Sequence, residues 1–251
     1  MKFIKLILGR LFALWALFWF IVSMLMIFIP VWLIGLFSEP KRTRIFISIS
    51  RIWMGFFLPV AGIRLKIKGR ENFEKGKNYI VVCNHRSFMD IPVTSPGIPG
   101  ANKTIAKSEM AKIPLFGIVY KRGSVLVDRK DEESRKRSYN AMKEVLQMGL
   151  HMCIYPEGTR NRSNLPLKEF KDGAFRLAIE TQKAVIPAVL LNTATVLPSN
   201  RFFYFWPGKI EMHFLSPVET TGMKTDQVKD LREKIFQVMW KELEKQNAFG
   251  T

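Results

Sequence analysis

The sequence is poor in the residues that bind metals or form disulfide bonds. Among 251 residues there are only two cysteines and three histidines. The cysteines, Cys83 and Cys153, each fall in a predicted apolar strand and lack the close spacing of metal ligands. We therefore expect both to be small hydrophobic residues of the core, and the composition argues against a disulfide scaffold or a zinc site.

Acidic residues are also scarce. The chain carries 21 aspartates and glutamates against 39 lysines and arginines, which gives a formal net charge of +18. Such an excess suits partners that carry phosphate, either a nucleic acid or an anionic membrane surface. Because 48% of the residues are hydrophobic and only 24% are charged, the chain is not a disordered basic tail.

The longest stretch without a charged residue lies near the N-terminus, at residues 11–37. It exceeds the roughly 20 residues that a membrane-spanning helix needs, and it lacks the small-residue cleavage site of a signal peptide. A second apolar stretch follows at residues 45–63. We therefore predict that residues 1–61 form a membrane-anchoring segment, and that residues 62–251 form a separate domain able to fold without it.

The orientation of this segment in the membrane is left open by its charges. Basic residues flank the first apolar stretch at both ends, so the positive-inside rule does not discriminate. Two arrangements compete, a single spanning helix and a helical hairpin that dips into one leaflet. We expect the active site to face the cytoplasm.

The remainder of the chain alternates between strand and helix patterns. The predicted strands cover residues 63–69, 79–83, 103–107, 123–129, 151–155, 184–192 and 209–218. The predicted helices cover residues 108–122 (broken, with Ser108 as its cap), 131–149, 173–183 and 224–247. Such alternation predicts an α/β fold with a single largely parallel or mixed sheet and flanking helices, preceded by the hydrophobic helical segment.

Polar residues follow the predicted strands at the points where they end. His85 follows strand 79–83, Lys107 ends strand 103–107, Arg129 ends strand 123–129, and residues 157–160 follow strand 151–155. Because ligands of such sheets bind at the carboxyl ends of the strands, we expect these residues to share one site.

His85 and Asp90 are the most informative pair. Five positions on a helix place two side chains well off a common face, so they meet only across a strand exit, a loop and the first turn of a helix. By itself the pair is also compatible with an ordinary polar turn. The other histidines, His151 and His213, lie in strands without an acid at useful spacing, and we expect neither to act chemically.

Four short motifs occur in order between roughly residues 64 and 215. They are Asn84-His85-x4-Asp90, Gly123 with Arg129, Glu157-Gly158-Thr159-Arg160 after Pro156, and Val185-Ile186-Pro187. Together they resemble the motifs of the glycerolipid acyltransferase family, specifically the lysophosphatidate acyltransferases. One departure is Leu126, which stands where the second motif usually has phenylalanine, and it affects only local packing.

The resemblance implies an enzyme that transfers an acyl group from acyl-CoA or acyl-carrier protein to lysophosphatidic acid, giving phosphatidic acid without a cofactor. His85 would take the proton of the acceptor hydroxyl, a role that suits an imidazole with a reference pKa of about 6.5. Asp90 would orient the ring, and backbone N–H groups near the start of the next helix would stabilise the oxyanion. Ser87 is expected to be a turn residue rather than a nucleophile.

The acceptor phosphate would need cations at defined positions. Arg129 and Arg160 suit bidentate contacts, and Gly158 would allow a tight turn before Arg160. Glu157 is expected to orient Arg160 or a glycerol hydroxyl. The full set of predicted substrate-binding residues is Lys107, Gly123, Arg129, Glu157, Gly158, Thr159, Arg160 and Lys171.

Three other functions compete with this interpretation. The acceptor could be another lysolipid, such as a lyso-ornithine lipid or a lysophospholipid. A membrane-tethered nucleic-acid-binding module would explain the positive charge, but the basic residues are dispersed and lack the aromatic-flanked groove of single-strand binders. A serine hydrolase would need a Gly-x-Ser-x-Gly elbow, which the sequence does not contain.

Overall fold

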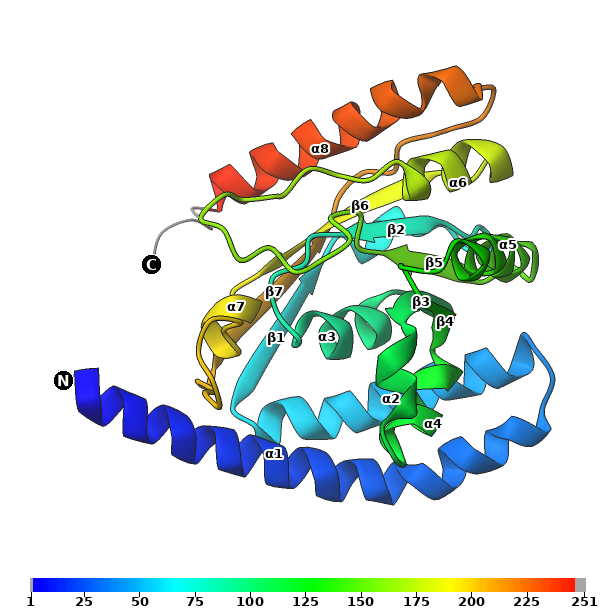
Figure 1. Ribbon diagram of the computed structural model, residues 1–251. Coiled ribbons are helices and arrows are strands. Elements are labelled where there is room, and N and C mark those ends of the chain that lie inside the picture. Colours follow the sequence, from blue (N-terminus) through cyan, green and yellow to red (C-terminus); the bar gives the residue numbers. More distant parts are fainter. Residues whose placement is uncertain (1, 247–251) are drawn as a thin grey trace.

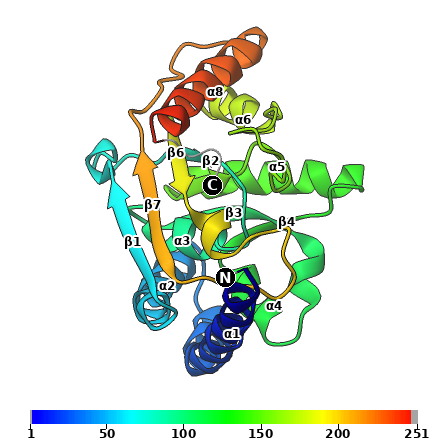
Figure 2. The ribbon, with the colours of Figure 1, turned by 90° about the vertical axis from the view of Figure 1, so that its left-hand side faces the viewer.

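The computed structural model describes residues 2–246, so Asn247 at the end of the last predicted helix lies outside the described residues. The fold is one sheet with helices on both faces (Figures 1 and 2). Its strands are β1 (Ile63–Lys68), β2 (Ile80–Cys83), β3 (Asn102–Lys107), β4 (Ser124–Val127), β5 (His151–Ile154), β6 (Val185–Leu191) and β7 (Gly208–Phe214).

The predicted helices occur in the predicted order, together with a short helix at Thr193–Val196 that the sequence pattern did not predict and short 3-10 segments. The α-helices are α1 (Lys2–Leu33), α2 (Lys41–Val60), α3 (Asp90–Gly97), α4 (Phe116–Arg122), α5 (Glu132–Gln147), α6 (Gly173–Thr181), α7 (Thr193–Val196) and α8 (Val228–Lys245). The 3-10 segments are η1 (Ile34–Leu36), η2 (Arg70–Asn72), η3 (Ser108–Lys112) and η4 (Thr225–Gln227).

The strand order in the sheet is β1-β7-β6-β2-β5-β3-β4. The run from β6 to β4 is parallel throughout, whereas β7 is antiparallel to β6 and parallel to β1. This confirms the predicted single mixed sheet. The carboxyl ends of β2, β3, β4 and β5 therefore lie together at one end of the sheet, where such folds bind their ligands.

Two hydrophobic cores lie on the two faces of the sheet. Helices α5, α6 and α8 cover one face, and α3 with the N-terminal helices covers the other (Figures 1 and 2). Strands β2, β5 and β6 are buried along their whole length, which explains why their sequences are continuous apolar runs. Cys83 and Cys153 are free and buried in the neighbouring strands β2 and β5, and both are small residues of the core on the side of α3 and the N-terminal helices, as predicted.

Helix starts are only partly as the sequence predicts. Asp131 caps α5, where its carboxylate accepts hydrogen bonds from the backbone N–H groups of Glu133 and Ser134. The predicted capping role of Ser108 is wrong, because its hydroxyl approaches the carboxylate of Glu109 at 3.4 Å and accepts no bond from the helix backbone. The break in this region is confirmed, because η3 and α4 are separate elements.

The N-terminal helices form a hairpin rather than a lone helix. Both α1 and α2 are long and apolar enough to cross a membrane, judged by length and composition. They lie side by side and run in opposite directions (Figure 1). The indole of Trp53 donates a hydrogen bond to the Ser23 hydroxyl at 2.9 Å, and that of Trp15 donates to the Val60 carbonyl at 2.9 Å. The hairpin is thus held by specific polar contacts as well as by apolar packing.

Helix α2 also packs against the α/β domain. Its buried side chains belong to the same core as β1, β2 and α3. Near its middle, Arg51 donates hydrogen bonds to the carbonyl oxygens of Pro96, Ile98 and Gly100, at 3.2, 2.8 and 2.8 Å. The composition changes near Gly62 as the sequence shows, but the packing continues across that point.

Candidate active site

The loop after β2 is tied to the neighbouring strand by Asn84. Its side-chain amide donates to the Leu190 carbonyl at 3.0 Å, and its amide oxygen accepts from the Leu190 N–H at 2.7 Å. Asn84 is fully buried. This paired contact with the end of β6 sets the point at which the chain leaves the sheet, directly before His85.

His85 and Asp90 meet in the manner that the sequence requires. The chain leaves β2, passes through a short loop and starts α3 at Asp90. The Nδ1 atom of His85 lies 2.7 Å from Oδ2 of Asp90, and that oxygen also accepts from the backbone N–H groups of Arg86 and Ser87 at 2.8 and 2.9 Å. These contacts hold the carboxylate in place and leave Nε2 as the nitrogen able to face a substrate.

Backbone N–H groups at the start of α3 were the predicted oxyanion donors. Those of Arg86 and Ser87 are already engaged by Asp90, so they serve the carboxylate instead. The Ser87 hydroxyl donates to the Leu197 carbonyl at 2.7 Å and accepts from the Met89 N–H. Ser87 is therefore a buried turn residue, as the sequence predicts.

Tyr155 is a residue of the site that sequence reasoning missed. It follows β5, the strand beside β2, and its ring stacks on that of His85 with a centroid distance of 4.4 Å and an interplanar angle of 30°. Tyr155 is buried, so it forms a fixed wall against one face of the imidazole. The available signal was its position at the end of the predicted strand 151–155, directly before the segment that carries Glu157 and Arg160.

Glu157 is buried, with only 3% of its surface exposed. Its Oε1 accepts from the His85 N–H at 2.7 Å, and its Oε2 accepts from the Lys168 N–H at 2.9 Å. The expectation that Glu157 orients Arg160 is wrong, because its two oxygens hold backbone groups of separate segments. Burial raises the pKa of Glu157 from its usual 4.5 to about 7.

We predict that Glu157→Gln lowers both stability and activity. A glutamine amide accepts only one of the two N–H bonds, and an unsatisfied buried donor typically costs about 1–3 kcal/mol. Between pH 4.5 and 7 the folded wild-type protein keeps a proton that the unfolded chain releases, so its stability falls as pH rises through that window. Denaturant unfolding in detergent should show the gap between the two proteins narrowing from pH 5 to pH 8. A constant gap would contradict this assignment.

The turn that carries Arg160 has the predicted conformation. Gly158 has a φ of +72°, which favours glycine, and its N–H donates to the Tyr155 carbonyl at 3.0 Å. The guanidinium of Arg160 lies over the ring of Phe88 at 3.7 Å from the centroid. Within the described residues it makes no hydrogen bond or ion pair, so its N–H groups are able to receive an anion.

The other predicted binding residues differ in their surroundings. Arg129 and Lys171 are exposed, and exposed Lys107 pairs with Glu109 at 2.8 Å. The Thr159 hydroxyl accepts from the Lys168 ammonium at 2.9 Å. Of these side chains, Arg129 and Lys171 are open to an approaching anion, whereas Lys107 is paired with a carboxylate.

Gly123 is explained by packing. It is buried beside α2, where an added Cβ would lie 2.5 Å from the ring of Phe46. The structure therefore gives Gly123 a packing role against the hairpin, and its contact with substrate stays a prediction.

The remaining histidines are buried in strands. The Nδ1 atom of His151 accepts from the Tyr79 N–H at 3.0 Å, and burial lowers the pKa of His151 to about 4. The expectation that His213 has no nearby acid is wrong, because its ring nitrogens lie 3.0 Å from carboxylate oxygens of Glu211 and Glu242. His213 thus joins β7 to α8. Within residues 2–246 no group of three or more histidine, cysteine, aspartate or glutamate side chains is arranged so that it could hold a metal ion.

The fold and the site together define an α/β enzyme in which a histidine paired with a buried carboxylate lies near Arg160, an arginine that is unpaired within residues 2–246. A family model described as Acyltransferase matches residues 64–191, and the chain belongs to this acyltransferase family.

Relatives and a solved structure are similar over much of the chain. The 1-acyl-sn-glycerol-3-phosphate acyltransferase of Haemophilus influenzae is 29% identical, with 85% of this chain and 88% of the relative covered. The alpha enzyme of that name from Homo sapiens is 31% identical, with 69% of this chain and 62% of the relative covered. The crystal structure of the 1-acyl-sn-glycerophosphate (LPA) acyltransferase PlsC from Thermotoga maritima has a TM-score of 0.81 at 25% identity, covering 98% of both chains.

Proposed function

We propose that this protein transfers an acyl group from a thioester to the free hydroxyl of lysophosphatidic acid, giving phosphatidic acid. The observation that carries the proposal is the 2.7 Å contact between His85 and Asp90 at the carboxyl edge of the sheet, beside the open Arg160. Family membership and relatives that carry this activity in their names support it.

The proposed reaction has one chemical role for the histidine. Nε2 of His85 takes the proton of the acceptor hydroxyl as its oxygen attacks the thioester carbonyl carbon. Asp90 stabilises the imidazolium that results. A carbon–oxygen bond forms, the carbon–sulfur bond breaks, and the imidazolium returns the proton to the thiolate. The products are phosphatidic acid and the free thiol of CoA or acyl-carrier protein, and no residue of the enzyme is acylated.

The acceptor phosphate is proposed to bind Arg160. Stacking on Phe88 holds the guanidinium plane while its N–H edge stays open, a geometry that suits bidentate contact with phosphate. Arg129, Lys107 and Lys171 would add positive charge around it.

We predict that Arg160→Ala raises the apparent KM for the acceptor strongly, by about tenfold or more, because it removes hydrogen bonds to a charged group. The KM for the acyl donor should change little. Arg160→Lys should rescue only partly, since the planar fork is lost. Arg162→Ala, which removes an exposed charge two residues further on, is the control. Equal effects on donor and acceptor would argue against a phosphate contact.

The hairpin is proposed to lie in one leaflet, with the active site facing the cytoplasm. Large apolar side chains of α1 are exposed along much of the helix, among them Phe3, Ile4, Trp15, Phe18 and Met26. Both substrate and product carry acyl chains that reside in a bilayer, so the active site has to lie near the headgroups. The basic Lys41, Arg42 and Arg44 would attract anionic lipid there.

A purified-enzyme assay tests the proposal directly. Lysophosphatidic acid, a lyso-ornithine lipid and other lysophospholipids would each be offered with a radiolabelled acyl thioester, as the CoA and carrier-protein forms in turn. Preference for lysophosphatidic acid supports the proposed acceptor, and preference for another lysolipid replaces it. Absence of transfer to every acceptor, together with binding to oligonucleotide over anionic vesicles at physiological salt, would overturn the proposal.

A further inference from the structure

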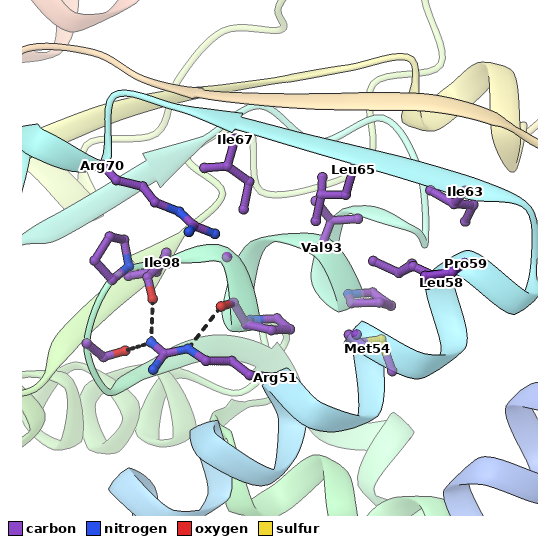
Figure 3. Close-up of a pocket in the computed structure, with 16 residues that line it drawn as sticks. Arg51, Met54, Leu58, Pro59, Ile63, Leu65, Ile67, Arg70, Val93 and Ile98 are labelled. Carbon is purple, nitrogen blue, oxygen red and sulfur yellow. Dashed lines mark hydrogen bonds between the residues drawn. The ribbon is translucent and has the colours of Figure 1, made fainter.

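A cleft of about 570 Å³ lies between the hairpin and the α/β domain (Figure 3). Its walls come from α2, β1, α3 and the turn after α3. Leu65 and Ile67 face it from the edge strand, Met54 and Leu58 from α2, and Val93 from α3. The volume falls in the range of ligand-binding pockets, roughly 300–1,000 Å³. Neither His85 nor Asp90 lines it.

The charged side chains that line this cleft are both arginines, Arg51 and Arg70, and no acid is among the lining residues. The guanidinium of Arg51 is held by three carbonyl oxygens of the segment from Pro96 to Gly100. Arg70 makes no side-chain hydrogen bond or ion pair with any residue from 2 to 246, and its guanidinium points toward the cleft beside Ile98 (Figure 3). One end of an apolar cleft thus carries positive charge that no acid neutralises.

We propose that this cleft binds an anionic membrane phospholipid, with its phosphate at Arg70 and one acyl chain along the apolar walls. The inference rests on the membrane-docking part of the proposed function. Helix α2 borders the cleft and also exposes Ile52 and Phe56, which are 75% and 45% accessible. The cleft therefore opens beside a surface suited to lipid. A lipid bound there would contact α2 and β1 together and hold the hairpin against the domain.

The first test compares two lipids with identical chains and different head groups. Full-length protein in non-ionic detergent would be titrated with dioleoyl phosphatidylglycerol or dioleoyl phosphatidylcholine, and bound lipid counted by native mass spectrometry. We expect one tightly bound phosphatidylglycerol per chain, preferred by about tenfold or more, since hydrogen bonds to charged groups are stronger than neutral ones. Equal affinity for the two lipids would overturn the charge assignment.

Matched arginine variants locate the head group. Arg70→Gln should abolish most of the preference for phosphatidylglycerol. Arg64→Gln removes the same charge from β1, but at a position that alternates to the opposite face from Leu65, so it should leave the preference intact. If both variants lose it equally, the lipid is attracted by general positive charge and the proposed site is wrong.

Filling the cleft tests the position of the acyl chain. Gly55 lines the cleft from α2, and a Cβ built there meets no atom within 4 Å. Gly55→Leu therefore adds side-chain volume at a position where the new Cβ meets no atom, and leucine also favours the helix over glycine. We expect it to weaken binding of both lipids, and unchanged binding would overturn the site.

A further variant separates this inference from the proposed reaction. His85→Ala should bind phosphatidylglycerol as the wild type does, because His85 does not line the cleft. Selective phosphatidylglycerol binding without any acyl transfer would refute the proposed reaction and leave the lipid site standing. Loss of this binding in His85→Ala would instead place the lipid in the active site.

Discussion

His85→Ala is expected to lower the rate of acyl transfer by about 10²–10⁴-fold, the usual effect of removing a general base. The fold should survive, because Asp90 keeps its contacts with the N–H groups of Arg86 and Ser87 when the ring is absent. Release of the free thiol and formation of labelled product would be measured together, at saturating donor and acceptor. Both should fall by the same factor, since the same proton transfer limits them.

A second histidine provides the control. His213 also contacts carboxylates, but they are Glu211 of its own strand and Glu242 of α8, and α8 covers the opposite face of the sheet from α3, which carries Asp90. His213→Gln is therefore compared with the wild type at equal folded fraction, and we expect near wild-type turnover. Retention of more than a few per cent of activity in His85→Ala would show that another group is the base.

The parts of the fold that depend on local sequence could be predicted. β2, β5 and β6 are continuous apolar runs because both faces of each strand are covered, and Asp131 starts α5 by a local cap. The contact between His85 and Asp90 could be inferred because the strand exit, the loop and the helix start all lie within one short segment.

Contacts between segments that lie far apart in the chain could not be predicted from local sequence. The carboxylate of Glu157 reaches the N–H of His85, which is 72 positions earlier, so only the order of β2 and β5 in the sheet brings them together. The same holds for His213 and Glu242, which belong to β7 and α8. Burial patterns identify strands and helices, but neither the strand order nor the helix that covers a given strand follows from them.

The hairpin illustrates a second limit. An almost wholly apolar segment predicts contact with lipid, yet it does not show which of its faces meets protein. In α2, Ile47 is buried while Ile52 is exposed, although the two side chains are chemically identical. The composition change near Gly62 therefore predicted that residues 62–251 form an independent domain. It did not reveal that α2 and this domain share one hydrophobic core.

Removal of residues 1–61 is accordingly expected to unfold the remaining chain, contrary to what composition alone suggests. The large side chains that α2 buries are Phe46, Ile47, Trp53, Met54, Phe57 and Leu58. Full burial of one such side chain contributes about 1.5–3 kcal/mol, so the six together contribute about 9–18 kcal/mol, which is as large as the whole free energy of unfolding of a typical domain, about 5–15 kcal/mol.

The fragment 62–251 would be compared with a fragment 38–251, which keeps α2 and loses α1. Thermal unfolding followed by circular dichroism, with limited proteolysis in detergent, would report on both. We expect a cooperative transition in the longer fragment and none in the shorter one, because Arg51 and the buried face of α2 contact the domain directly. If fragment 62–251 unfolds cooperatively and acylates a short-chain monomeric acceptor, the hairpin is only a tether. If it does neither, α2 is part of the catalytic domain itself, and membrane attachment and folding of the active site depend on the same helix.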